Sequence, residues 1–275
     1  FLTLEIDLTM IKKILSLFVL GLILYSCATV PITGRKQLKL VSNSEILPLS
    51  FDQYQQVLKE NKLSNNTKWV NMVKEVGYNI QMATEEYMRQ NGLQDKIAGY
   101  AWEFNLIESD VVNAWCMPGG KVAFYTGIMP ICEDETGVAV VMGHEVAHAI
   151  ANHGRERMSQ GLAANLGLST VSAAMGQNPT MTQELLLQSV GIGTQLGMLS
   201  FSRTHESEAD RIGLIFMAMA GYNPQAAPDF WKRMAAQSDG QRPPEFLSTH
   251  PHPDTRINDL RASLPEAMKY YRRSN

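Results

Sequence analysis

Gly143-His144-Glu145-Val146-Ala147-His148 is the stretch that decides the fold. Two histidines four residues apart lie about 40° apart around a helix, one turn along, so both imidazoles face the same way. Apolar runs flank the motif, at residues 138–142 and 149–151, which predicts a buried helix. Bare buried charges are costly, so the polar side chains of such a helix must share a satisfied site. The pattern H-E-x-x-H therefore indicates a metal site.

Two imidazoles beside a carboxylate suit one Zn²⁺ ion per chain, and a catalytic zinc site keeps one position open for water. Glu145 projects close to that position, where it can take a proton from water without binding the metal. H-E-x-x-H occurs by chance in roughly one chain of this length in a hundred. A further ligand is therefore needed to support the prediction.

His153 and the pair Glu206 and Asp210 are the candidates for that ligand. If the helix of the motif continues, His153 points away from His144, so we expect it to be a capping or surface histidine. Glu206 and Asp210 lie four residues apart on a second predicted helix. One of them can bind zinc while the other orients a ligand histidine.

The sequence from Ser202 to Arg211, placed well after H-E-x-x-H, resembles the zinc metallopeptidase family of HtpX, BepA, LoiP and the type I CAAX prenyl protease. Further matches are Asn113-Ala114, the turn at 118–120, Thr126-Gly127, and Leu247-Ser248-Thr249-His250-Pro251. The resemblance extends from about Val41 to the C-terminus. It implies a zinc-dependent endopeptidase that cleaves proteins.

The resemblance also assigns roles to residues. It implies that His144, His148 and Glu206 bind zinc, that Glu145 is the general base, and that Asp210 orients a ligand. The strand at Asn113 and Ala114 would hold an extended substrate by backbone hydrogen bonds. His250 has three interpretations: a catalytic residue that stabilises the oxyanion, a removable fourth zinc ligand, or an ordinary turn histidine.

The remaining pattern predicts an α+β fold, mainly helical, with a small antiparallel sheet whose edge strand flanks the active-site helix. Strands are expected at 100–106, 111–112 and 122–125, with a turn at 117–120. Helices are expected at 44–61, 66–90, 133–159, 204–220, 224–237 and 253–272. Residues 161–199 are read as an apolar helical hairpin that covers the cleft, rests on a membrane or belongs to the core.

The N-terminus is predicted to carry a targeting signal. Lys12 and Lys13 precede an apolar run at 14–25, too short for a membrane span. Leu24-Tyr25-Ser26-Cys27 resembles a bacterial lipobox, so residues 1–26 would be a signal peptide, with 1–9 not native, and Cys27 would carry lipid. Residues 27–40 would form an irregular tether before a single peptidase domain at 41–275. We expect a cell-envelope location, on the outer membrane facing the periplasm.

The composition argues against some other classes of protein. The formal net charge is −3, which gives no strong field to recruit nucleic acid. Three cysteines are too few for a disulfide scaffold. Cys116 and Cys132 could pair in an oxidising compartment, but we favour two buried free thiols. The main alternative to an active peptidase is a latent or non-catalytic lipoprotein chaperone or scaffold with the same zinc site. The sequence does not indicate an oligomeric state.

Overall fold

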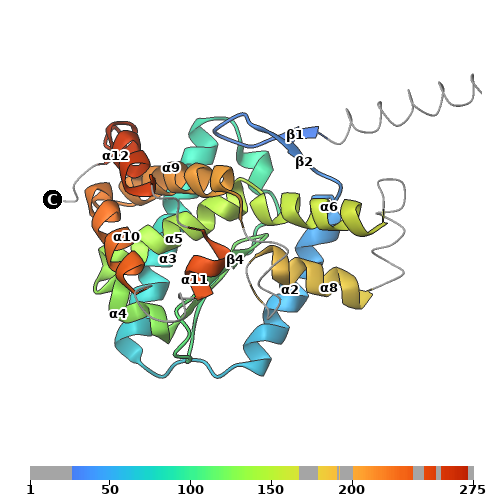
Figure 1. The fold of residues 1–275 in the computed structure, drawn as a ribbon, viewed down its shortest axis with the longest axis horizontal. Helices are drawn as coiled ribbons and strands as arrows, with labels where there is room; N and C mark the ends of the chain where they lie inside the picture. The colour runs from blue at the N-terminus through green and yellow to red at the C-terminus, as the bar shows by residue number, and fades with distance from the viewer. Residues whose placement is uncertain are drawn as a thin grey trace, which may run out of the picture.

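The computed structural model describes residues 27–166, 179–190, 192, 201–237, 245–251 and 255–271. The fold is α+β and mainly helical, as expected, with a three-stranded sheet against a layer of helices (Figure 1). The predicted signal peptide, most of the predicted 161–199 hairpin and both ends of the predicted 253–272 helix lie outside the described residues. Within the described part, no helix is both long and apolar enough to span a bilayer.

The described helices and strands follow the chain in a simple order, with strands confined to the first half. They are β1 (Cys27–Thr29), β2 (Lys36–Leu38), α2 (Asn43–Glu60), α3 (Thr67–Gln90), β3 (Glu103–Ile107), β4 (Ala114–Met117), β5 (Lys121–Tyr125), α4 (Met129–Cys132), α5 (Glu135–Ile150), α6 (His153–Leu166), α8 (Pro179–Ser189), α9 (Arg203–Met219), α10 (Ala227–Ala236), α11 (Glu245–Thr249) and α12 (Arg256–Ala267).

The sheet has the order β3-β5-β4 and corrects part of the sequence prediction. β4 and β5 pair antiparallel across the expected turn, but β3 pairs parallel with β5. The third strand is β4, not residues 111–112, where the chain bends before it reaches the sheet edge. β4 is one of the two edge strands and packs against α5, so the prediction that an edge strand flanks the active-site helix is correct.

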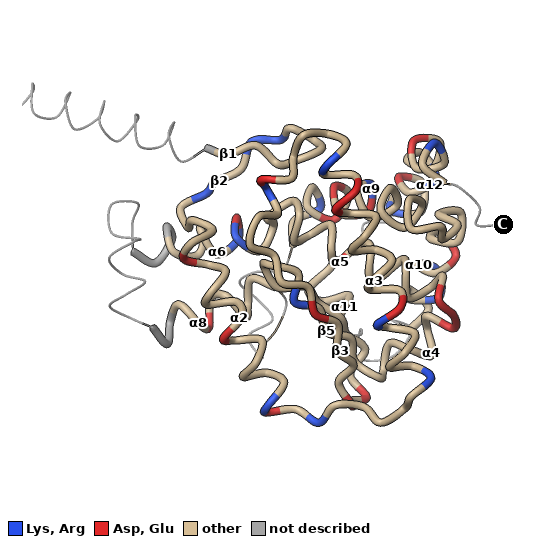
Figure 2. The backbone as a smooth tube through the Cα atoms, turned by 180° about the vertical axis from the view of Figure 1, so that it is seen from behind, with Lys and Arg blue, Asp and Glu red and all other residues tan. Residues whose placement is uncertain are grey.

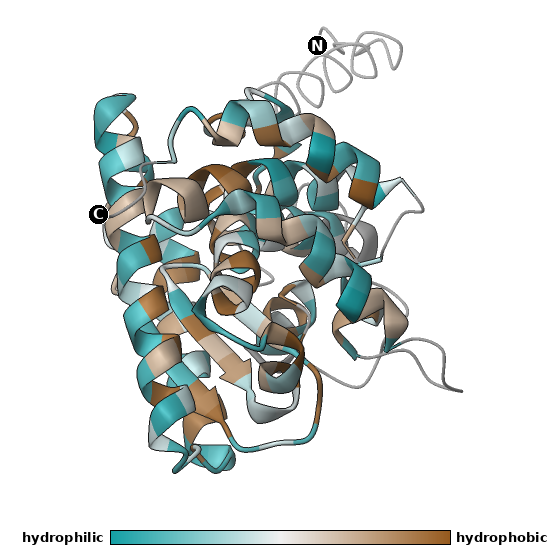
Figure 3. Ribbon diagram, turned by 90° about the vertical axis from the view of Figure 1, so that its left-hand side faces the viewer, coloured by the Kyte–Doolittle hydropathy of each residue, from teal (hydrophilic) through white to brown (hydrophobic). Residues whose placement is uncertain are grey.

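Helix α5 lies at the centre of the molecule, between the sheet, α3 and α9. Residues 137–150 of this helix are all buried, and apolar segments gather in the inner helices and the sheet (Figure 3). Charged residues of both signs are interleaved along the outer segments (Figure 2). Cys116 and Cys132 are buried free thiols.

The predicted long helix at 133–159 is wrong, because it is two helices. Asp134 caps the start of α5 by accepting a hydrogen bond from the Gly137 amide. The helix ends at Ile150, and Asn152 takes a left-handed conformation with φ of 58°. Asparagine tolerates this conformation better than most residues. The chain therefore turns before α6 begins at His153.

The predicted irregular tether at 27–40 is also more ordered than expected. β1 and β2 form an antiparallel hairpin through a turn at 30–35. The hairpin lies over the ends of α6 and α9 in Figure 1, and β2 packs against α6.

Candidate metal centre

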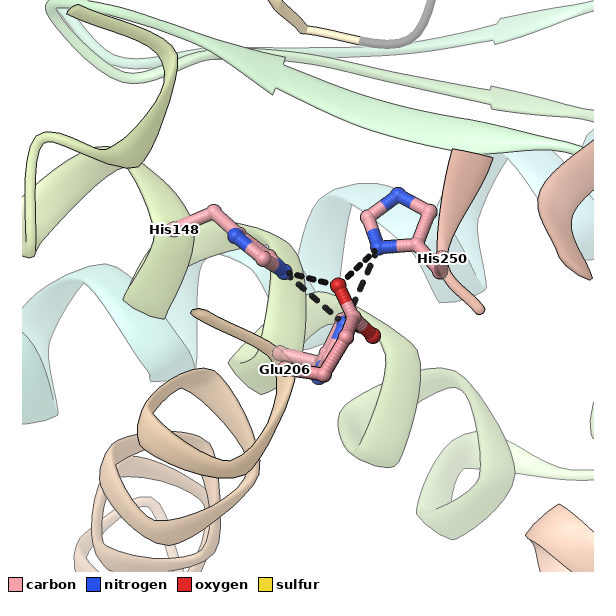
Figure 4. A group of neighbouring side chains, drawn as sticks. His148, Glu206 and His250 are labelled. Carbon is pink, nitrogen blue, oxygen red and sulfur yellow. Dashed lines mark hydrogen bonds and ion pairs between the residues drawn. The ribbon is translucent and has the colours of Figure 1, made fainter. Parts of the chain in front are cut away.

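Four side chains from three segments converge at the middle of the fold. His144 and His148 come from α5, Glu206 from α9, and His250 from the residue after α11. One ligand atom of each lies within 4.8 Å of all the others, and this is the one such group among the described residues. Figure 4 shows the imidazoles of His148 and His250 pointing at the Glu206 carboxylate.

The distances between the ligand atoms fit a single small cation. His144 Nε2 lies 3.0 Å from His148 Nε2, 3.3 Å from His250 Nδ1 and 3.5 Å from a Glu206 oxygen. The other Glu206 oxygen lies 3.4 Å from His148 Nε2 and 3.1 Å from His250 Nδ1. Ligands about 2.05 Å from a tetrahedral zinc ion would be separated by about 3.3 Å. The donor set therefore matches zinc in both type and spacing.

Two further buried side chains, Asp210 and Arg256, hold members of this cluster by hydrogen bonds. Asp210 accepts a 2.9 Å hydrogen bond from His144 Nδ1, so Nε2 is the ring nitrogen of His144 that faces the cluster. Arg256 of α12 donates to Asp210 at 2.6 Å and to Glu206 at 3.2 Å, and stacks on Trp231. The sequence alone assigned no role to Arg256. Its role is a tertiary contact across 50 residues.

Glu145 has the surroundings of a general base. Burial raises the pKa of this carboxyl to about 8, because nearby cationic groups and the Cys116 backbone amide only partly offset the desolvation. One of its oxygens is buried without a hydrogen-bond partner, 3.7 Å from His250 Nε2, which also has none. Glu145, His148 and Cys116 of the edge strand line a small pocket there.

The histidines of the cluster differ in protonation because their neighbours differ. Burial acts to lower the pKa of His144, but its hydrogen bonds with Asp210 and Glu206 outweigh this and raise the pKa to about 9. Burial lowers the pKa of His250 to about 4. The pKa of Glu206 lies well below its usual range: burial opposes this, but His250 and the other histidines outweigh it.

The prediction that His153 is a capping or surface histidine is wrong. Its side chain is fully buried, and its Nδ1 lies 2.9 Å from His148 Nδ1. The chain turns at Asn152, so His153 comes back to the face of α5 that carries the motif. The signal in the sequence was Asn152 itself, a residue that often ends a helix in the left-handed conformation.

The predicted substrate strand lies beside the centre. Tyr125 donates its amide to the Asn113 carbonyl, so strand alternation turns the backbone groups of Ala114 and Cys116 away from β5. The Asn113 side chain accepts from the Ala114 amide and donates to Glu245 at 3.0 Å. The Phe246 amide also donates to the Val112 carbonyl. Helix α11 is thus bonded to the start of this sheet edge, whose strand β4 is buried along its whole length.

This arrangement is that of a metalloendopeptidase: two histidines on one buried helix, a carboxylate from a second helix, and beside them a glutamate with one unpartnered oxygen. A family model described as Peptidase family M48 matches residues 77–264. The chain belongs to peptidase family M48.

Named proteins that are similar in sequence to this chain are consistent with the family assignment. The mitochondrial metalloendopeptidase OMA1 of Schizosaccharomyces pombe is 31% identical over 240 residues, which cover 87% of this chain and 67% of that protein. The beta-barrel assembly-enhancing protease of Escherichia coli K12 is 35% identical over 58% of this chain and 34% of that protein. The human mitochondrial OMA1 is 29% identical over 87% of this chain and 46% of that protein. The chain therefore spans less than half of the last two.

Proposed function

We propose that this protein is a zinc-dependent endopeptidase in which His144, His148 and Glu206 bind the metal. The observation that carries the proposal is the spacing of these ligand atoms, which lie 3.0 to 3.5 Å apart. A zinc ion held there would polarise the scissile carbonyl and make water a stronger acid.

Glu145 is proposed as the general base. It takes the proton of the attacking water and delivers it to the leaving amine. Glu145 lines the pocket and has one oxygen without a hydrogen-bond partner, so this oxygen is available to accept from a water molecule. Asp210 keeps Nδ1 of His144 protonated and so directs its Nε2 lone pair to the metal.

The substrate is proposed to be an extended segment of an unfolded protein, added to the sheet beside β4. The outward carbonyl of Cys116 suits this mode best, because the Ala114 amide already has a partner in the Asn113 side chain and the Cys116 amide is bonded to Glu145. A folded protein rarely offers an unpaired strand, so misfolded or unassembled envelope proteins are the proposed substrates. The name of the beta-barrel assembly-enhancing protease supports this choice.

The location is proposed to be a bacterial envelope, with lipid on Cys27 and the enzyme at the outer membrane facing the periplasm. The lipobox-like sequence at 24–27 supports this. Cys27→Ser should move the protein from the membrane pellet to the soluble fraction and abolish labelling with radioactive palmitate. A Cys27→Ser protein that still carries label would refute lipidation at this residue.

Cleavage of casein by the purified protein tests the proposal. We expect one zinc ion per chain, cleavage that a chelator stops, and loss of cleavage in Glu145→Gln with its zinc retained. If Glu145→Gln cleaves as well as the parent, Glu145 is not the base. If the zinc-loaded parent cleaves no unfolded protein, the non-catalytic scaffold is the better function.

A latent enzyme is a second candidate, and the position of His250 favours it. His250 supplies a fourth ligand atom where a catalytic site needs room, and the four cluster residues are at most 2% exposed. We propose that His250 is a removable ligand, held by α11. His250→Ala should then raise the rate of casein cleavage. A fall in rate would instead assign His250 to oxyanion stabilisation, and no change would make it a turn residue.

A further inference from the structure

The turn of the β1–β2 hairpin presents a threonine and an arginine to helices α6 and α9. Ile32 and Gly34 have φ of 77° and 73°, and the Gly34 amide donates to the Val30 carbonyl. This tight turn directs Thr33 and Arg35 toward the helices. Both side chains bond to Glu208, which lies two residues after the proposed ligand Glu206.

Arg35 joins two buried carboxylates from different helices. Its Nε donates to Glu208 of α9 at 2.8 Å, and its two terminal nitrogens donate to Glu156 of α6 at 3.1 and 2.7 Å. The Thr33 hydroxyl donates to the other oxygen of Glu208. Glu156 and Glu208 are 6% and 7% exposed, and buried carboxylates need such compensation.

A chain of hydrogen bonds leads from Arg35 to the proposed metal ligand His148. The Glu208 oxygen that accepts from Arg35 lies 2.9 Å from His153 Nε2. His153 Nδ1 lies 2.9 Å from His148 Nδ1. The chain therefore has three links, and it begins in a hairpin about 100 residues before α5.

The chemistry of the links fixes where each proton lies. A carboxylate paired with arginine only accepts, so His153 donates from Nε2. A neutral His153 then accepts at Nδ1, and His148 must donate from its own Nδ1. The lone pair of His148 is left on Nε2, the atom that faces the metal cluster. Asp210 does the same directly for His144.

The cluster of His153, Glu156, His205 and Glu208 could be mistaken for a second metal site. Arg35 already lies between the two carboxylates, and His205 Nε2 bonds to Glu156 at 3.1 Å. Among the described residues, the geometry to hold a metal ion occurs at the His144 group and not here. The guanidinium supplies the positive charge that a cation would supply.

We propose that Arg35 is a positioning residue for the metal ligand His148, acting through Glu208 and His153. The N-terminal hairpin is thus part of the peptidase site and more than a tether. The inference rests on the proposed metal site. It assigns Thr33 and Arg35 a role in how tightly the metal is held.

Zinc affinity of the purified full-length protein, measured by competition with a chromophoric chelator, is the first test. Mutating a residue that hydrogen-bonds to a metal ligand typically weakens metal affinity about 10- to 100-fold. Glu208 and His153 lie between Arg35 and His148, so Arg35→Gln should weaken zinc binding about 10-fold. Its kcat for casein should fall while KM stays unchanged. Arg211→Gln is the matched control, because Arg211 makes a two-pronged pair with Glu266 on the outer side of α9. It should bind zinc within twofold of the parent.

A double-mutant cycle separates positioning from general loss of structure. In a His153→Ala background, Arg35→Gln should cause no further loss of zinc affinity, because the link to His148 is already gone. The milder Thr33→Val serves if Arg35→Gln melts too low to assay, and should show a smaller loss of the same kind. Equal zinc affinity in Arg35→Gln and Arg211→Gln overturns the inference, as does an undiminished loss in the His153→Ala background. A parent that binds no zinc would instead overturn the proposed metal site.

Discussion

Replacing Gly143 by alanine should weaken metal binding more than it weakens the fold. Gly143 precedes His144 on α5 and faces Gly213 on α9, where the two helices touch through their backbones. A Cβ at Gly143 would lie 2.8 Å from the Gly213 carbonyl oxygen. Backbone atoms cannot rotate away, so one helix must move.

The size of the movement follows from the contact. Ordinary contact begins at 3.4 Å, so the helices must separate by about 0.6 Å. Metal–ligand distances tolerate about 0.2 Å, and the proposed ligands are divided between these two helices. We therefore expect a loss of zinc affinity of about 10- to 100-fold. Overpacking costs about 1–3 kcal/mol, and the gain in helix propensity offsets about 1 kcal/mol of it.

Thermal unfolding of the zinc-free protein and chelator competition measure the two effects separately. Gly77→Ala is the matched control, because its Cβ would meet the Phe104 ring at the α3–sheet contact, away from the metal centre. It should lower the melting temperature and leave zinc affinity unchanged. Parent-like zinc affinity in a folded Gly143→Ala protein would refute the argument that the α5–α9 spacing sets the ligand geometry.

Three further predictions concern charge. Glu145→Gln should lower kcat by about 10²–10⁴-fold, with zinc content unchanged by metal analysis; loss of zinc would make Glu145 a ligand. Zinc must displace the proton of His144, whose pKa is about 9 in the metal-free protein. Zinc affinity should therefore weaken about tenfold for each pH unit below 9. Zinc affinity that stays constant from pH 9 to 6 in chelator competition would contradict this. Burial acts to raise the pKa of Glu156, but His205 and Arg35 outweigh it and lower the pKa from 4.5 to about 2. The parent should therefore be more stable than Arg35→Gln above pH 4.5, and this difference in stability should vanish toward pH 2. Melting curves across this range that keep a constant difference would rule out the Arg35–Glu156 pair as its source.

The sequence was most informative where contacts are local. Spacing on one helix placed His144 and His148 together, and the same spacing placed Glu206 and Asp210 on a shared face. It was least informative at Asn152, where no glycine announces the left-handed residue that separates α5 from α6. That single turn moved His153 from the expected surface into the site.

Pairings between distant segments were beyond the pattern of residues. β3 pairs in parallel with β5, although β4 is the next strand after β3 in the chain. β4 lies on the other side of β5, at the opposite edge of the sheet. Alternation in a strand indicates which face is buried but not which strand lies beside it. The role of Arg35 was hidden for the same reason, since its partners lie 121 and 173 residues away.

Helix α9 explains why both ends of the chain are needed for the metal centre. It carries three buried acids: Glu206 and Asp210 share the face that meets His144, and Glu208 lies on another face, beside Arg35 and His153. An unpaired buried carboxylate costs several kcal/mol, so α9 packs favourably only when each acid has a cation. Arg256 of α12 serves Glu206 and Asp210, and Arg35 of the hairpin serves Glu208. Because these arginines come from opposite ends of the described chain, the ligand geometry at α5 depends on the completed fold.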